Sequence, residues 1–215
     1  MSLKIIHTAD WHLGQTFFGY DRDEEHEAFL SWLIDILTLR QTDVLLIAGD
    51  VFDVANPSAA AQRRFFRFLR EANRHNPQLQ IVIIAGNHDS AARLEAPIPL
   101  LEELNTSIVG VVPRTDLCKI DFDSLLIPLY NKEGKREAIC LAVPYLRQGD
   151  YPASKEGKDT YVGGVTRMYR QLYDYADSQR QPGEALFAMG HLHATGAELS
   201  EDDRSERTIM GGLVG

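Results

Sequence analysis

The amino-acid sequence predicts an α/β protein with two β-sheets, and three observations support this prediction. Over about the first hundred residues, short apolar runs of strand length alternate with helical periodicity, the pattern of strand–helix–strand units. From Ser107 the pattern changes to short β-like pieces joined by turns, which indicates a second sheet packed on the first. Four apolar runs also share one ending, a small residue or glycine followed by a residue that can ligate a metal. These runs are Ile5–His12, Val44–Asp50, Ile81–Asp89 and Leu186–His193.

Residue spacing and start and stop signals predict the elements of the α/β opening. Phe29, Leu33 and Leu37 recur at helical spacing. Ser58 can cap a second helix, which Asn76-Pro77 stops. The predicted elements are a strand from Ile5, a loop over Gly14–Tyr20, a helix over Arg22–Leu39, a strand over Asp43–Ala48, a helix from Ser58 to about His75, a strand over Gln80–Ala85 and a short helix over Ile98–Leu104.

The second half of the chain is predicted from shorter signals. The β-like pieces are Ile108–Val112, Leu117–Phe122, Leu125–Leu129 and Ala138–Val143. A polar, glycine-containing loop is expected between Gln148 and Gly164. A helix over Val165–Ser178 then precedes the fourth apolar run, so the second sheet and its helix complete the predicted architecture.

Length, charge and cysteine content bound the class of protein. With 215 residues and 44% hydrophobic residues, the chain can form one large domain, or one domain with an appendage. The net charge of -9 and the lack of a basic tract argue against DNA binding. This argument is weak, because carboxylates that could ligate metal ions account for part of the negative charge. Cys118 and Cys140 show no Cys-x-x-Cys spacing, and two such thiols are more often reduced than paired. Since no signal peptide or membrane-length apolar stretch is recognisable, a soluble cytoplasmic protein without membrane contact is expected.

The first two runs end in residues suited to a divalent metal. Asp10-x-His12 places a carboxylate and an imidazole on one side of an extended segment. In the run that contains Asp50, Gly49 lets the backbone turn sharply, and the Asp50 carboxylate has two oxygens with which to bridge two ions. Asp53 is either a group beside the metal ligands or a turn residue.

The third run, Gly86-Asn87-His88-Asp89, adds a proton donor to the ligands. The amide oxygen of Asn87 is a neutral metal ligand, His88 can give a proton to a leaving oxygen, and Asp89 can orient the His88 imidazole. Mixed nitrogen and oxygen ligation suits Mn²⁺ or a similar ion. Two ions about 3.5–4 Å apart can hold both the attacking and the leaving oxygen of a phosphoester during hydrolysis.

In this order, the motifs Asp-x-His, Gly-Asp-x-x-Asp, Gly-Asn-His-Asp and Gly-His resemble those of the calcineurin-like metallophosphoesterase superfamily. The finer pattern around Asp10, with Gly-Asp-Val-Phe-Asp-x-x-x-Pro, is similar to the SbcD-type exonuclease subunits, bacterial members of the meiotic-recombination-type DNA-repair nucleases. Val54 and Asp89 stand where protein phosphatases of the superfamily typically have Arg and Glu. The resemblance covers essentially the whole chain and implies a four-layer α/β/β/α sandwich, two sheets flanked by helices, over residues 1–215.

The resemblance also implies which residues hold metal. Asp10, His12 and Asp50 would hold one divalent ion. Asp50, Asn87 and His191 would hold the other. Both ions are expected to be Mn²⁺.

The function implied by the resemblance is that of a Mn²⁺-dependent DNA nuclease, acting as exonuclease and endonuclease in DNA repair, recombination and replication. Such a hydrolase cuts phosphodiesters with water activated by two metals, and His88 would be its transition-state and leaving-group residue. The implied partners are DNA and an SbcC-type coiled-coil ATPase, with the nuclease subunit forming a homodimer within a heterotetramer.

One departure from the family pattern concerns the last histidines. The full motif set has an isolated Gly-His ligand and, further on, a Gly-His-x-His pair, whereas the chain has no histidine between His88 and His191. Either Gly190-His191-Leu192-His193 is the final pair and the isolated ligand is missing, or His191 is the isolated ligand and the final pair lies beyond Gly215. The residues after His193 favour the second interpretation, so the domain is expected to be truncated at its C-terminus and His193 to be a near-match.

Two other functions are compatible with the motifs. The first is another metallophosphoesterase activity, on cyclic nucleotides or small phosphodiesters. The second, from a different class, is a non-catalytic interaction scaffold on the same fold. Retention of Asp10, His12, Asp50, Asn87 and His88 argues against the scaffold.

Several conspicuous residues have structural interpretations. His7 is expected in the core, and His26 and His75 at the surface. Aromatic residues near the first motif can stack on unpaired bases, but packing is favoured for them: Trp11, Phe17, Phe18 and Tyr20. Four arginines can track phosphates, but a solvated helix face is favoured: Arg63, Arg64, Arg67 and Arg70.

Overall fold

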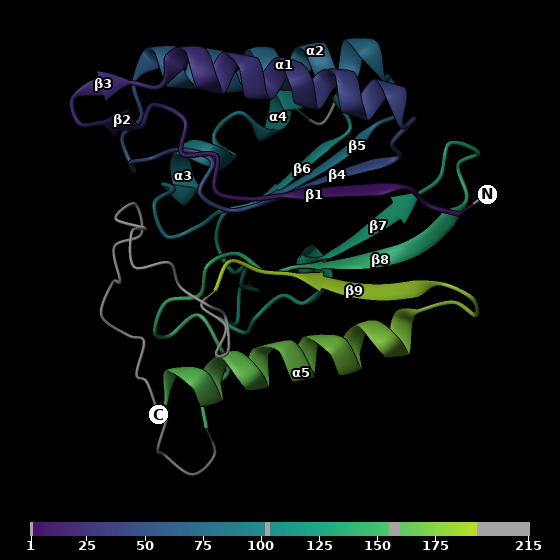
Figure 1. Cartoon of the computed structure of the whole chain (residues 1–215). Helices are drawn as coiled ribbons and strands as arrows, with labels where there is room; N and C mark the ends of the chain where they lie inside the picture. The colour runs from purple at the N-terminus through teal and green to yellow at the C-terminus, as the bar shows by residue number, and fades with distance from the viewer. Residues whose placement is uncertain (1, 102–103, 155–159, 193–215) are drawn as a thin grey trace.

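The computed structural model describes residues 2–101, 104–154 and 160–192, and these form four layers. Helices α1 and α2 cover one face of a first sheet, a second sheet packs on its other face, and helix α5 covers the outer face of the second sheet (Figure 1). The predicted α/β/β/α sandwich is confirmed. Within the described ranges, no helix combines the length and the apolar character needed to cross a membrane.

The first sheet is parallel throughout, with the strand order β1-β4-β5-β6. Its strands are β1 (Ile5–Thr8), β4 (Val44–Ala48), β5 (Gln80–Ile84) and β6 (Thr106–Val109). Alternate residues of β4 enter different cores: Leu45 and Ile47 face the helices, while Val44, Leu46 and Ala48 face the second sheet. Burial on both faces explains why β4 is apolar throughout.

The strand β6 corrects one prediction. The sequence around Ile108 was expected to begin the second sheet, but β6 pairs in parallel with β5 and ends the first sheet. Two short helices, α3 (Ala91–Glu95) and α4 (Ile98–Leu101), lie between the two strands and provide the crossover. The helix predicted over Ile98–Leu104 corresponds to α4, residues 102–103 lie outside the described residues, and α3 was not predicted.

The two long N-terminal helices agree closely with the predictions. They are α1 (Asp23–Leu39) and α2 (Ala59–His75). The hydroxyl of Ser58 accepts a hydrogen bond from the backbone N–H of Ala61 at 3.1 Å, which confirms Ser58 as the N-cap of α2.

The second sheet has the order β7-β8-β9. Strand β7 (Leu126–Tyr130) runs antiparallel to β8 (Arg136–Ala142), and β9 (Ala185–Met189) runs parallel to β8. The helix α5 (Tyr161–Gln179) begins four residues before the predicted Val165, because Thr160 caps it through a bond from the N–H of Gly163.

Two local predictions failed for reasons of turn geometry. Within Leu117–Phe122 the described structure has only an isolated bridge between Arg114 and Ile120, followed by the short 3₁₀ helix η2 (Asp123–Leu125). Conversely, the loop over Gly14–Tyr20 contains a small hairpin, β2 (Thr16–Phe17) and β3 (Tyr20–Asp21). Its two turn residues, Phe18 and Gly19, have positive φ, as a two-residue hairpin turn requires, and Phe18 gives no such signal in the sequence.

Three polar side chains lie in environments that the sequence did not predict. His7 is exposed because β1 is an edge strand. His26 is only 5% exposed, because α1 turns this residue inward beside Trp11 and Phe29 in one pocket wall. Arg64 is 7% exposed, so it belongs to the α1–α2 interface and not to a solvated face.

The other predictions of side-chain burial were partly confirmed. His75 is exposed, and Trp11 packs in the core against Phe65 and Phe68, as expected. The hairpin aromatics Phe17, Phe18 and Tyr20 are exposed, and the rings of Phe17 and Phe18 contact each other edge to face. Both cysteines are free, Cys140 buried and Cys118 exposed.

Candidate metal centre

The carboxyl ends of the parallel strands bring three loops to one edge of the first sheet. The loop after β1 is bonded to the loop after β4: the N–H of Asp10 donates to the carbonyl of Gly49 at 3.1 Å, and the N–H of His12 donates to the carbonyl of Asp50 at 3.0 Å. Asp10, His12 and Asp50 have positive φ values of 57°, 45° and 49°. Non-glycine residues rarely adopt this conformation, and such strain concentrates at functional sites.

Two glycines give these loops room to approach one another. A Cβ on Gly49 would lie 2.4 Å from Nδ1 of His191, and a Cβ on Gly86 would lie 2.0 Å from Oδ1 of Asp50. Both distances are far inside van der Waals contact, so no other residue fits at either position without moving the side chains of the site. The glycines of the sequence motifs are therefore required by packing as well as by the turns.

Asp50 lies at the centre of the cluster and is 3% exposed. Its Oδ1 accepts the backbone N–H of His88 at 2.9 Å. Its Oδ2 lies 3.8 Å, 4.0 Å and 3.5 Å from Nε2 of His12, His88 and His191. Burial alone would raise the pKa of Asp50, but the hydrogen bonds from His191 and from the backbone of His88 outweigh it and hold that pKa below its ordinary value.

His191 reaches this cluster from the second sheet, at the end of β9. Its Nδ1 donates to the carbonyl of Ala48 at 2.9 Å, and its Nε2 donates to Oδ1 of Asn87 at 2.8 Å. Burial alone would lower the pKa of His191, but the hydrogen bond and the charge of Asp50 raise it to about 9. The proton on Nε2 therefore supplies, beside Asp50, positive charge of the kind that a metal ion would supply.

The side chain of Asp53 lies beside His12. Its Oδ1 is 3.3 Å from Nδ1 of His12, within ion-pair distance, although the pair is not aligned as a hydrogen bond. Two overlapping groups have ligand atoms within 4.8 Å of one another: Asp10 with His12 and Asp50, and His12 with Asp53 and His88. Asp53 is thus placed among potential ligands and not only at a turn.

His88 and Asp89 correct a predicted role. Asp89 was expected to orient the His88 imidazole, but its buried carboxylate accepts backbone N–H groups from Gly86, Val51 and Phe52 at 2.9, 3.2 and 3.0 Å. The ring of His88 is oriented by the carbonyl of Asp53, to which its Nδ1 donates at 2.7 Å. The side chains of adjacent residues leave the chain in different directions, so Asp89 points into the loop while His88 points into the site.

Five of the predicted site residues lie around a small cavity of about 160 Å³. Asp10, Asp50, Asn87, His88 and His191 line it, and His12 adjoins it through Asp50. Two further polar side chains in its lining, His7 and Tyr145, were not predicted to belong to the site. Tyr145 follows β8 without any motif, and its N–H donates to the carbonyl of Ala85 at 2.8 Å. His193, a candidate ligand, lies outside the described residues.

The donor set fits divalent ions. It consists of carboxylates, an amide oxygen and imidazoles around one shared carboxylate oxygen, and no thiolate takes part among the described residues. Nδ1 of His88 and of His191 each donates to a backbone carbonyl, which turns Nε2 toward the cluster, as second hydrogen bonds commonly do for metal-binding histidines.

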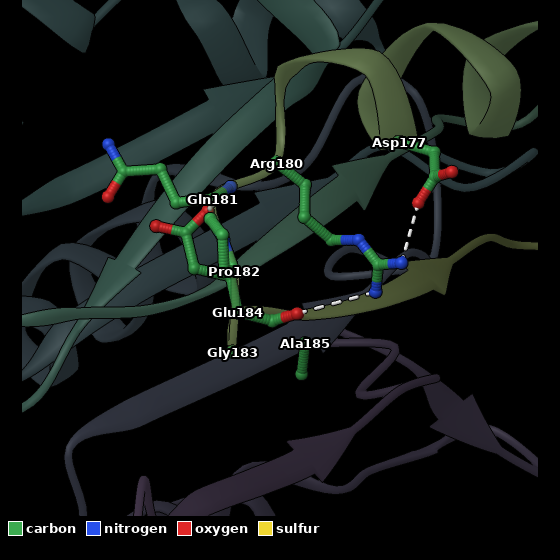
Figure 2. Close-up of a pocket in the computed structure, with 7 residues that line it drawn as sticks. All are labelled: Asp177, Arg180, Gln181, Pro182, Gly183, Glu184 and Ala185. Carbon is green, nitrogen blue, oxygen red and sulfur yellow. Dashed lines mark hydrogen bonds and ion pairs between the residues drawn. The ribbon is translucent and has the colours of Figure 1, made fainter.

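A larger hollow of about 620 Å³ lies at the turn between α5 and β9 (Figure 2). Figure 2 shows Arg180 between the carboxylate of Asp177, at 2.8 Å, and the carbonyl of Glu184, at 3.5 Å. Glu184 also pairs with Arg136 of β8. The charged side chains around this hollow therefore hold the turn together. The hollow lies at the opposite end of β9 from His191, and among the described residues it has no cluster of ligand atoms.

Comparison with known proteins matches residues 3–210 to the family described as calcineurin-like phosphoesterase. The chain is 44% identical over 214 residues to a Rhodobacter capsulatus protein named as the SbcD component of the nuclease SbcCD, covering 98% of this chain and 52% of that protein. Proteins of the same name from Escherichia coli K12 and Bacillus subtilis 168 are 33% and 30% identical, covering 93% and 94% of this chain and 48% and 50% of those proteins. The chain therefore spans about half the length of these curated relatives.

Proposed function

The chain belongs to the calcineurin-like phosphoesterases, and we propose that it is the catalytic domain of a divalent-metal-dependent DNA nuclease that hydrolyses phosphodiester bonds. The observation that supports this most directly is the position of Oδ2 of Asp50. Imidazoles from three separate loops, those of His12, His88 and His191, lie within 4.0 Å of this one oxygen. Such a shared, buried carboxylate oxygen is suited to bridge two cations.

The ligands of the two proposed ions are those that the motifs suggest. Asp10, His12 and Asp50 would hold one ion, and Asp50 would share the other with Asn87 and His191. When bound, the two ions, proposed to be Mn²⁺, would neutralise charge on the phosphoryl oxygens and lower the pKa of the attacking water.

The residues of the chain have separate tasks in this reaction. The carbonyl of Asp53 accepts the proton on Nδ1 of His88, so Nε2 is the nitrogen that faces the site. Protonated at both nitrogens, the ring would give its Nε2 proton to the leaving oxygen of a phosphodiester and would remain as a neutral imidazole with the proton on Nδ1. Two of the backbone bonds to Asp89, from Val51 and Phe52, tie the loop of His88 to the loop of Asp50, and the third, from Gly86, closes the His88 loop itself. These bonds keep the proton donor at a constant position beside the ligands.

The proposed partners follow from the relatives, which are named as components of a nuclease. We propose DNA as substrate and an SbcC-type coiled-coil ATPase as partner, within a heterotetramer that contains two copies of the nuclease chain. The proposed processes are DNA repair, recombination and replication. The two free cysteines are compatible with the proposed cytoplasmic setting, where thiols stay reduced.

Replacing His88 tests the proposal. His88→Ala should retain Mn²⁺ binding by calorimetry, because His88 is not among the proposed ligands, while the rate of linear DNA cleavage falls by about 10²–10⁴-fold. His75→Ala is the matched control, because His75 is exposed at the end of α2. Unchanged cleavage by His88→Ala would contradict the assigned role. Hydrolysis of bis(p-nitrophenyl) phosphate without any cleavage of DNA would indicate a small-phosphodiester enzyme instead.

A further inference from the structure

A second pocket, of about 430 Å³, adjoins the metal centre. It shares Asp10 and His12 with the proposed metal ligands and is also lined by Trp11, His26 and Phe29. We call it the Trp11 pocket. The cavity of about 160 Å³ beside it is the smaller of the two. Since binding sites for small organic molecules commonly occupy about 300–1,000 Å³, the Trp11 pocket has the size of a ligand site and the cavity at the metal centre does not.

The charges around the Trp11 pocket do not favour a phosphate. Among the described residues that line the pocket, the only arginine is Arg22, whose guanidinium donates a hydrogen bond to Oε1 of Gln15 at 2.8 Å. The carboxylate of Glu25, another lining residue, is exposed. Asp10 adds a second carboxylate. Burial, with the nearby charges of Arg22 and Arg64, holds the pKa of His26 below its ordinary value, so its imidazole is neutral at pH 7.

The walls of the Trp11 pocket suit a neutral heterocycle. Trp11 and Phe29 meet edge to face, with ring centroids 5.6 Å apart, and provide the apolar wall. His26 is a polar ring where a helix core position would ordinarily be apolar, and its buried Nδ1 has no hydrogen-bond partner among the described residues. A planar ligand with both apolar faces and a polar edge, such as a nucleobase, matches this combination.

From this geometry we infer that the Trp11 pocket receives the base and sugar of the nucleotide next to the scissile phosphate. The inference rests on the proposed function, because it assumes that the phosphate lies at the metal centre. Asp10 and His12 line the boundary between the two sites, so a nucleoside in the pocket is one step along the strand from the ions. A base in the pocket cannot remain stacked in a duplex, so cleavage should favour frayed, mismatched or single-stranded DNA.

Glu25 and Glu24 provide a matched pair of variants. Both side chains are exposed in the first turn of α1, but only Glu25 lines the Trp11 pocket. Glu25→Trp should fill the mouth of the pocket, whereas Glu24→Trp should not. Both variants lose the same favourable interaction of an acidic side chain with the helix N-terminus, so any shared effect on stability cancels in the comparison.

The direct test is a fluorescence titration with 2-aminopurine deoxyriboside in EDTA, which needs neither metal nor activity. The wild type and Glu24→Trp should bind this nucleoside with the same affinity, and Glu25→Trp should bind at least about tenfold more weakly because its mouth is blocked. With Mn²⁺, Glu25→Trp should raise KM for single-stranded DNA by a similar factor with little change in kcat.

The outcomes distinguish nucleoside binding in the Trp11 pocket from the proposed nuclease activity. Three outcomes would contradict the inference that the Trp11 pocket binds a nucleoside. They are equal nucleoside binding by Glu25→Trp and wild type, an equal loss of binding in both variants, and no binding by the wild type. If the wild type binds the nucleoside and Glu25→Trp does not, but the wild type cleaves no DNA with Mn²⁺, the Trp11 pocket is a nucleoside site and the nuclease proposal is wrong. If the wild type cleaves DNA and Glu25→Trp has unchanged KM and nucleoside affinity, the nuclease proposal is supported and the Trp11 pocket is not a nucleoside site.

Discussion

At the scale of single residues, the site depends on how each polar atom is used. Asp50 uses one oxygen to hold the His88 loop and leaves the other to the imidazoles. Asp89, one residue from His88, uses its whole carboxylate for backbone N–H groups. Motif spacing identified both aspartates as candidates but could not distinguish these tasks, because the partners of Asp89 include Val51 and Phe52, 38 and 37 residues away.

Replacing Asp89 by asparagine should therefore reduce stability. The amide keeps the shape of the side chain but can accept at only one oxygen, so at least one buried N–H loses its partner, at a cost of about 1–3 kcal/mol in the free energy of unfolding. Urea denaturation at pH 7 measures the change. Asp116→Asn, at an exposed position, is the control and should be neutral. If both variants unfold at the wild-type urea concentration, the three backbone bonds do not stabilise the loop.

At the scale of elements, α1 and α2 are joined by a charged clamp as well as by their apolar faces. The buried guanidinium of Arg64 on α2 pairs with Asp23 at 2.8 Å and with Glu27 at 2.9 Å, both on α1. Its hydrogen bond holds the pKa of Asp23 below its ordinary value. Burial would raise the pKa of Glu27, but the bonds from Arg64 and Arg67 outweigh it and lower that pKa as well.

This clamp predicts a pH-dependent stability. Because both carboxyls have lowered folded-state pKa values, their contribution is present above the ordinary values of 3.8 and 4.5 and is lost as the pH falls through the folded values. Arg64→Met should cost about 1–2 kcal/mol at pH 7, a modest value because both carboxylates are partly exposed. The difference from wild type should shrink as the pH is lowered below 3.8, measured by urea denaturation at each pH. Arg63→Met, at an exposed position of α2, should show no such difference at either pH.

At the scale of the whole molecule, the candidate metal ligands come from both sheets. Asp10, Asp50 and Asn87 follow strands of the first sheet, whereas His191 follows β9 of the second. The bond from His191 to the carbonyl of Ala48 connects residues 143 positions apart. A cation bound by these residues would therefore hold the two halves of the sandwich together.

Mn²⁺ should consequently raise the thermal stability of the whole domain. At an ion concentration one hundred times Kd, binding to the folded state alone contributes about 2.7 kcal/mol. For a domain of this size that corresponds to a rise in Tm of about 5–10 °C, measurable by differential scanning calorimetry with Mn²⁺ and with EDTA. His191→Ala should lose most of this rise, whereas the control His75→Ala should keep it. An equal rise in both variants would show that His191 does not contribute to binding.

The sequence by itself determined the parts of this protein that depend on local pattern. The apolar runs of β4 and β5, the cap at Ser58 and the order of the motifs all follow from residue spacing and side-chain chemistry, and each can be seen without knowing the neighbours in space. The same spacing identified Asp10, His12, Asp50 and Asn87 as potential ligands.

Only the tertiary structure decided which of these parts meet. The assignment of β6 to the first sheet, the burial of His26, the orientation of His88 by Asp53 and the approach of His191 across both sheets depend on contacts between distant segments. Hydrophobic periodicity specifies which face of a strand or helix is buried, but it does not specify the partner against which that face packs. The motifs therefore predicted a metal site, and the packing of the two sheets determined how its candidate ligands meet.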